Sequence, residues 1–155
     1  MSTHPDQDAV KSLYQAIRLV RPIHLNVARV VERQLEGTGI TVPMRAVLEL
    51  LVEEGPSSGP QIAARLSLKR QFVHRTISVL REAGLVERRD NELHKRSDLF
   101  VPSAAGRAAF KRIHSHELRV LAEQMNDVSD ADIAAVHKVL ALVDRVFSDL
   151  AKEEI

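Results

Sequence analysis

The chain of 155 residues has no cysteine, no tryptophan and a single tyrosine. Without cysteine, a disulfide framework, a thiolate zinc site and a thiol redox switch are excluded. Aromatic residues make up only 3% of the chain. Stacking on the bases of single-stranded nucleic acid, which depends on aromatic side chains, is therefore poorly supported.

Long apolar runs are also missing, since no stretch approaches the ~18 residues that a membrane span needs. Residues 1–12 lack the basic and then apolar pattern of a secretory signal. We therefore expect a cytoplasmic protein with no membrane partner. The chain has no glycine-rich phosphate loop, nucleophile elbow or His-Glu-x-x-His motif. We predict that it is not an enzyme, that it has no catalytic residues and that it needs no cofactor.

Charge is unevenly distributed along a chain whose formal net charge is only +1. The segment 69–96 contains eight Lys or Arg residues and four acidic residues, an excess of four positive charges. Clustered basic residues are the electrostatic signature of nucleic-acid binding, even in a protein that is nearly neutral overall.

Two short helices are predicted before this basic segment. Thr41 has the side chain of an N-cap, and Pro43 falls in the first turn that follows it. Ser58 and Gln61 have the spacing of a capping box, which opens a second helix that runs to Leu66.

A third helix is predicted from Ser67, its expected N-cap, to about Ala83. Val73, Ile77 and Leu80 form its apolar side, at intervals of four and three residues. At about 100° per residue, the opposite side of the helix points into solvent. That side carries residues able to form hydrogen bonds: Gln71, His74, Arg75 and Ser78.

A charged hairpin is predicted after the third helix. Residues 85–88 and 98–102 have the composition of two strands, and residues 93–96 form the tip between them. Two helices, a basic helix and a charged hairpin, in this order, are typical of a winged helix-turn-helix. The pattern favours a DNA-binding regulator.

Helical spacing of apolar residues continues on both sides of this unit, over residues 8–36, 103–124 and from Ser129 onward. Pro22 interrupts the first of these segments, where we expect a kink or a short break. Ser129 with Asp132 three residues later is the expected start of the last helix. These helices have more apolar surface than the central unit can cover, so we expect a homodimer.

The predicted fold is therefore mostly α, with a small two-stranded β-wing. It is a winged helix-turn-helix flanked by N- and C-terminal dimerisation helices.

The block from Thr41 to Gly106 resembles the MarR family (multiple antibiotic resistance regulators). The matching residues are the pattern E.G…S…IA.RL.L.R..V.R.I..L...GLVER, the HKRS sequence at the hairpin tip and the Ala-Gly-Arg helix start at 105–107. The helices on either side also fall where that family has its dimerisation helices. The resemblance therefore extends over nearly the whole chain.

This resemblance implies a DNA-binding unit at residues 41–103, between dimerisation regions at 1–40 and 104–155, all in one continuous domain. It also implies a homodimer that binds a pseudo-palindromic operator in double-stranded DNA, usually as a repressor. Release from the operator would follow the binding of a small apolar or anionic ligand.

The resemblance assigns DNA contacts as well. The residues that would lie on the recognition helix are Arg70, Gln71, His74 and Arg75. Arg96 falls where the family has its minor-groove arginine. Gln71 and Arg75 suit base edges, because Gln pairs with adenine and Arg with guanine. The full predicted set is Ser58, Lys69, Arg70, Gln71, His74, Arg75, Ser78, Arg88, Lys95 and Arg96.

Two positions depart from the family pattern. His94 stands where the wing often has an acidic residue, which leaves open how the free wing is held. Phe72 stands where the recognition helix more often has a small polar residue. It either touches a thymine methyl group or packs under the wing.

Two alternatives stay open. In a metal-responsive regulator of the same fold, the ligands would be histidines, but His114 and His116 do not share a helix face. His24 and His137 belong to other helices, so we predict no metal site. A winged helix that binds another protein often lacks a basic outward face, which this chain retains.

Overall fold

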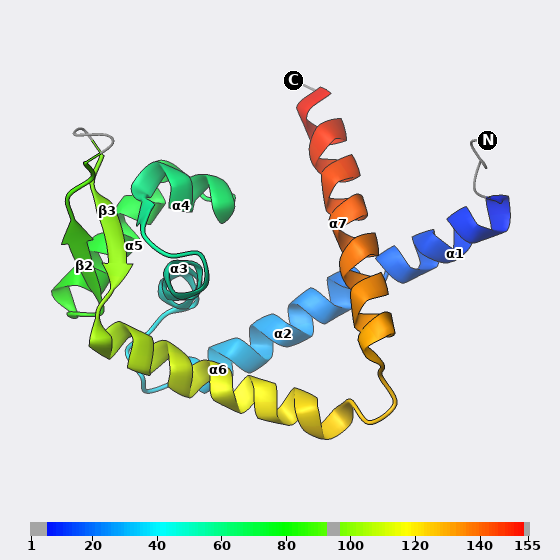
Figure 1. Cartoon of the computed structure of the whole chain (residues 1–155), viewed down its shortest axis with the longest axis horizontal. Helices are drawn as coiled ribbons and strands as arrows, with labels where there is room; N and C mark the ends of the chain where they lie inside the picture. The colour runs from blue at the N-terminus through cyan, green and yellow to red at the C-terminus, as the bar shows by residue number, and fades with distance from the viewer. Residues whose placement is uncertain (1–5, 93–96, 154–155) are drawn as a thin grey trace. The chain divides into compact units, whose positions relative to one another are not determined.

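The computed structural model describes residues 6–92 and 97–153 (Figure 1). The packing divides the chain into two units, one ending at His114 and the other beginning at Ser115. The first unit contains α1 to α5, three short strands and the start of α6, and the second contains the end of α6 and α7. Within the described ranges, no helix is both long enough and apolar enough to cross a membrane.

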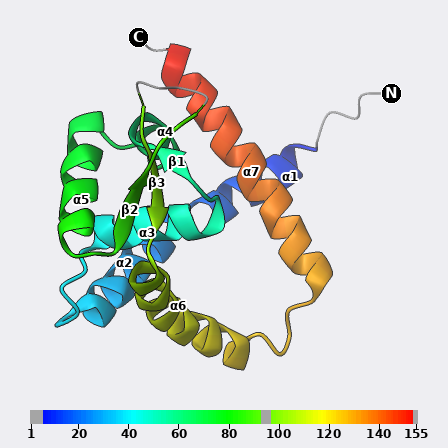
Figure 2. The ribbon, with the colours of Figure 1, turned by 60° about the vertical axis from the view of Figure 1, so that its left-hand side comes forward.

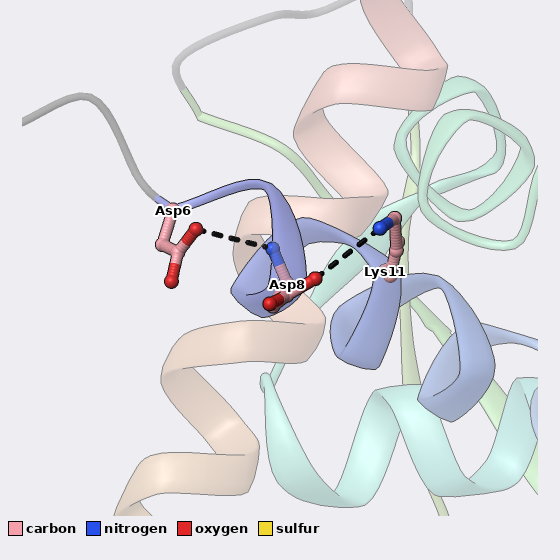
Figure 3. Close-up of polar contacts among 3 residues, drawn as sticks. All are labelled: Asp6, Asp8 and Lys11. Carbon is pink, nitrogen blue, oxygen red and sulfur yellow. Dashed lines mark hydrogen bonds and ion pairs between the residues drawn. The ribbon is translucent and has the colours of Figure 1, made fainter.

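Helix α1 (Gln7–Ile17) begins with a chain of polar contacts in its first turn (Figure 3). Asp6 is the N-cap, and its carboxylate accepts a hydrogen bond from the backbone N–H of Asp8 at 3.4 Å. The carboxylate of Asp8 forms an ion pair with Lys11 at 3.2 Å. Because negative charge is favourable at the N-terminus of a helix, both aspartates stabilise the start of α1.

The expected interruption near Pro22 is confirmed. Helix α1 ends at Ile17 and α2 (Val20–Leu35) follows after Arg18 and Leu19, so the segment is split. A proline ring clashes with the carbonyl four residues earlier, which here belongs to Arg18. Pro22 lies in the first turn of α2, where backbone N–H groups have no partner inside the helix and its missing donor is tolerated.

Three helices contribute most of the core of the first unit: α3 (Val42–Glu53), α4 (Gly59–Arg65) and α5 (Arg70–Glu82). The Thr41 hydroxyl accepts a hydrogen bond from the N–H of Met44 at 3.4 Å, which confirms the predicted cap of α3. The largest completely buried side chains all come from these helices, and Val73 and Leu80 among them confirm the predicted apolar side of α5: Val47, Leu48, Leu51, Ile62, Val73 and Leu80.

The prediction that Ser67 caps the third helix is wrong. Lys69 is the N-cap of α5, and Ser67 has a φ of 52°, in the left-handed region. The N–H of Ser67 donates to the carbonyl of Ala64 at 3.3 Å, and the N–H of Leu68 donates to that of Ala63 at 2.9 Å. These two bonds form a Schellman motif. Ser67 therefore closes α4 instead of starting α5.

The predicted hairpin is confirmed as β2 (Val86–Arg89) and β3 (Leu99–Pro102), which pair in antiparallel fashion. The structure adds a third strand, β1 (Ser57–Ser58), which pairs with β3, so that the order is β1-β3-β2 (Figure 2). The sequence did not predict β1, because two serines have no apolar alternation and carry the signature of a helix cap.

Ser103 joins the start of α6 (Ala104–Gln124) to the turn after α5. Its hydroxyl donates to the carbonyl of Gly84 at 2.7 Å and accepts from the N–H of Gly106 at 3.0 Å, while its own N–H donates to the carbonyl of Leu85 at 3.0 Å. The first turn of α6 lies so close to this backbone that a Cβ added at Gly106 would meet the Leu85 oxygen at 2.0 Å. Only glycine fits this contact without a shift of the backbone.

The second unit contains the end of α6 and α7 (Asp130–Glu153). The predicted cap is confirmed: the N–H of Ser129 donates to the Asp132 carboxylate at 3.0 Å, and the Ser129 hydroxyl donates to it at 2.5 Å. No described side chain of this unit is buried. The apolar residues of both helices are mostly exposed, among them Leu118, Leu121, Val136, Leu140, Phe147 and Leu150.

Candidate DNA interface

Helix α5 has one face in the core and the opposite face in solvent. Val73, Thr76, Ile77 and Leu80 are buried, whereas Gln71, His74 and Arg75 are exposed. The buried side holds the helix firmly, so the exposed side presents its amide, imidazole and guanidinium groups in a defined row. The predicted orientation of these three residues is confirmed.

The N-terminal end of α5 is also basic. Lys69 is the N-cap but makes no side-chain capping bond, and Arg70 is the first helical residue. Both side chains are exposed. The unpaired N–H groups of a helix N-terminus attract anions, and two neighbouring cations add to that attraction. The end of α5 is therefore suited to a phosphate group of a DNA backbone.

Two hollows flank α5 in the first unit (Figure 2 shows α5 beside β2). The larger, of about 630 Å³, lies between the end of the helix and β2, and its lining includes Ser78, Arg81 and Arg88. The smaller, of about 340 Å³, lies between the start of the helix, α4 and β3, and its lining includes Arg70, Gln71 and His74. Five of the predicted DNA-contact residues thus line a concave surface.

Arg88 has a partner within the protein. Its guanidinium forms an ion pair with Asp98 at 2.9 Å, which joins β2 to the residue just before β3. Sequence reasoning missed Asp98, because the pairing depends on the register of the two strands. The nearest available signal was the opposite charge of these two residues, which stand on either side of the predicted hairpin tip. Arg88 therefore links the two strands near the end of their ladder that faces the hairpin tip.

Ser58 precedes α4 and lies outside the exposed row. Ser78, seven residues after Gln71, lies on the same side of α5 as that row. Ser58 is buried, and both its N–H and its hydroxyl donate to Oε1 of Gln61 at 2.8 Å. Ser78 is half-buried, and its hydroxyl donates to the carbonyl of His74 at 3.0 Å. The DNA contacts assigned to both serines stay predictions.

Lys95 and Arg96, together with His94, lie outside the described residues. Their predicted contacts with DNA therefore also stay predictions.

Phe72 does not pack under the wing. Its side chain is 42% exposed, in the first turn of α5. Of the two interpretations drawn from the sequence, burial under the hairpin is therefore wrong.

The histidines do not gather in the part of the chain that the structure describes. Within residues 6–92 and 97–153, no group of three or more His, Asp or Glu side chains is placed to hold a metal ion. His114 instead stacks on Phe110, with the ring centroids 5.1 Å apart and the planes 16° from parallel.

A core-anchored helix with a polar outward face, beside a charged hairpin, defines a winged helix-turn-helix protein. Comparisons with known proteins agree. Residues 38–97 match the model of the MarR family. A curated relative, the uncharacterized HTH-type transcriptional regulator YwoH of Bacillus subtilis, is 31% identical over 106 residues, which are 68% of this chain and 77% of the relative.

Solved structures show the same similarity. The crystal structure of a MarR family transcription regulator is 38% identical with a TM-score of 0.75, over 93% of this chain and 95% of that one. The structure of Streptococcus pneumoniae FabT in complex with DNA is 22% identical with a TM-score of 0.69, over 88% of this chain and 99% of that one. The chain belongs to the MarR family, and it is a DNA-binding transcription regulator.

Proposed function

We propose that the protein is a sequence-specific regulator that acts in the cytoplasm and binds a pseudo-palindromic operator as a homodimer. The observation that carries this proposal is the exposed row of Gln71, His74 and Arg75 on a helix whose other side is buried. Arginine pairs bidentately with guanine and glutamine with adenine, and each such pair contributes about 1–3 kcal/mol of discrimination.

Affinity would come mainly from phosphate contacts. Lys69 and Arg70, exposed at the start of α5, would contact one strand, and the hairpin would bring Lys95 and Arg96 to the DNA as well. Neutralising phosphates releases counterions, so binding weakens steeply as salt concentration rises. Ser58, Ser78 and Arg88 already have partners inside the protein. Arg88 would have to share its guanidinium with Asp98 to reach a phosphate.

The homodimer is supported by the exposed apolar residues of the terminal helices. In α1 and α2 these include Tyr14, Ile23 and Val27, and in α7 they include Leu140 and Phe147. Apolar surface on this scale is usually covered by a partner. A symmetric pair of recognition helices would enter successive major grooves, about one helical turn apart. FabT, a protein of similar fold, was solved in complex with DNA, which supports DNA binding by this chain.

Repression, and release by a small apolar or anionic ligand, are proposed on the family resemblance. A thermal-shift screen should find a compound that stabilises the protein and also lowers its affinity for the operator. A compound set that contains no such molecule counts against ligand control. Metal analysis of the purified protein distinguishes the metal-responsive alternative, for which bound zinc would be expected.

The test of DNA recognition is fluorescence anisotropy with the DNA upstream of the protein's own gene, beside a scrambled duplex, at two salt concentrations. The intact protein should prefer the native duplex. Arg75→Ala should lose about tenfold or more on the native duplex and much less on the scrambled one, since one base contact is removed. Arg107→Ala, an exposed arginine on α6, is the matched control and should bind like the intact protein.

An equal loss on both duplexes would mean that Arg75 contacts only phosphate. No preference of the intact protein for the native duplex, with weak binding to both, would instead favour the protein-interaction module. A pull-down with the intact protein would then identify its partner.

A further inference from the structure

The recognition helix has an apolar flank that the proposed contacts do not use. Phe72 is 42% exposed and Val79 is 49% exposed. They are seven residues apart, so they lie within about 20° of each other around the helix. Arg75 lies between them in sequence, one turn from each, and joins this flank to the polar row.

This flank is separate from the hollows beside the hairpin. The hollows are lined by residues of the other side of α5, namely Arg70, Gln71, His74, Ser78 and Arg81 with their neighbours. Neither Phe72 nor Val79 is among the lining residues.

An isolated exposed apolar residue is ordinary. The exposed ring of Phe72 is informative because of where it lies on the recognition helix. Phe72 is the third residue of α5, between Gln71 and the buried Val73. The N-terminal residues of a recognition helix are those that contact base edges. A phenyl ring at this point has no hydrogen bond to offer, so it must contact an apolar group or displace water without compensation.

The major groove offers one such group. Among the four bases, only thymine presents a methyl group there, and apolar side chains, phenylalanine included, contact it. We propose that Phe72 determines part of the sequence specificity by packing on the 5-methyl group of a thymine. This inference rests on the proposed function, in which α5 enters the major groove.

The geometry also places the thymine. Residues three apart on a helix have Cβ atoms about 5–6 Å apart. Base pairs are spaced by about 3.4 Å along the duplex. The thymine should therefore lie within about two base pairs of the base that Arg75 contacts, in each half-site of the operator.

The test is a scan of the operator in which each symmetry-related pair of thymines is replaced by deoxyuridine, which lacks only the methyl group. Affinity is measured by fluorescence anisotropy with the full-length protein. A methyl group that is buried on binding contributes about fourfold in affinity, estimated from the free energy of burying one CH₂. We expect one pair of positions at which the intact protein loses roughly that factor per half-site, or about fifteenfold in total.

Phe72→Ala should bind the thymine operator more weakly than the intact protein, and it should be insensitive to deoxyuridine at that pair. Phe72→Leu, which keeps an apolar side chain, should retain part of the sensitivity. Val79→Ala on the same flank is the matched control and should keep the full response, because Val79 lies about two turns beyond Phe72, away from the helix N-terminus. Phe72 is exposed, so circular dichroism should show all three variants folded like the intact protein.

The outcomes separate this inference from the proposed function. If the intact protein prefers its operator and Phe72→Ala shows the same deoxyuridine profile, Phe72 does not recognise thymine, although the DNA-binding function stands. The same conclusion follows if no thymine position matters to the intact protein. If the intact protein shows no preference for any operator, the proposed function and this inference fall together.

Discussion

The central helices and the C-terminal helices have the same kind of apolar periodicity, but they use it differently. In α3 to α5, the apolar faces meet each other, and Leu48 and Leu80 are completely inaccessible to solvent. In α7, Leu140, Phe147 and Leu150 are all about half exposed. The first region completes its core within one chain. The second has the amphipathic pattern of a packed helix, yet none of its described side chains is buried.

This difference shows that an amphipathic pattern predicts that a face will be buried, but not which partner buries it. Helices α3, α4 and α5 are short and separated by tight turns, so their faces are brought together by the chain itself. Residues 115–153 consist of the end of α6, a short connection and the whole of α7. This unit has too little surface of its own to cover both apolar faces. A second chain is the partner that we propose.

The largest contrast should come from the same substitution made in each region. Leu48→Ala removes a completely buried side chain and should lower the free energy of unfolding by about 3 kcal/mol. Leu140→Ala, at a residue that is 51% exposed, should weaken dimer association instead. Urea unfolding and analytical ultracentrifugation at several protein concentrations measure both effects.

In that experiment, the Leu48→Ala loss should persist across the concentration series. The Leu140→Ala loss should grow as the protein is diluted. Equal losses without concentration dependence would mean that α7 has its partner within the same chain, and the contrast between the two regions would disappear.

The next effect tests how tightly the central region is packed. Gly106→Ala places a methyl group against the backbone oxygen of Leu85 and should cost about 2 kcal/mol of unfolding free energy, because backbone cannot move aside cheaply. Gly59→Ala is the matched control, since a Cβ there meets nothing within 4 Å. Denaturant midpoints of the two variants should separate clearly, and similar midpoints would show that α6 can shift away from the turn.

A smaller effect concerns two helix ends with the same hydrogen-bond pattern. Gly84 closes α5 with a φ of 70°, as Ser67 closes α4 with a φ of 52°. Because a residue with a Cβ is strained in this region, Ser67→Gly should raise the free energy of unfolding by about 1 kcal/mol.

The reverse change, Gly84→Ser, should lower the same free energy by a similar amount. Thermal unfolding of the two variants measures both changes in stability. If Ser67→Gly is destabilising, the serine makes a contact that offsets its strain.

The smallest effect is the pH dependence of the α7 cap. The pKa of the Asp132 carboxyl lies below its ordinary value, because the hydroxyl and then the backbone N–H of Ser129 donate hydrogen bonds to it. Folding lowers this pKa, so the ionised carboxylate stabilises α7 fully at pH values above the ordinary pKa of an aspartate. That contribution is lost as pH falls through the lowered pKa.

An NMR titration of the Asp132 carboxyl carbon measures the effect. In Ser129→Ala, the midpoint should move up toward the ordinary range. An unchanged midpoint would show that the hydroxyl is not the cause.

Much of the candidate site could be predicted from local pattern. The buried residues Val73, Ile77 and Leu80 define one side of α5, and helical geometry then places Gln71 and Arg75 on the other. The cap at Thr41 and the break before Pro22 follow from the chemistry of single residues in the same way. Such features need information from only a few neighbouring positions.

Other features depended on residues far apart in the chain. The ion pair between Arg88 and Asp98 requires the register of a hairpin. Strand β1 exists only because Ser57 and Ser58 lie beside β3. The assignment of Ser67 as a cap was wrong because Ser67 belongs to the left-handed turn that ends α4, and α5 begins only after it.

The sequence by itself determined the helices, the hairpin, the basic segment and the polar outward face of α5, because each depends on periodicity, capping or charge within a few turns of chain. Only the tertiary structure decided that Phe72 is exposed, that Ser58 is buried, that Arg88 is paired and that Gly106 cannot be replaced without strain. The physical reason is that burial and pairing are properties of what another segment places opposite a residue. A local pattern does not contain that information.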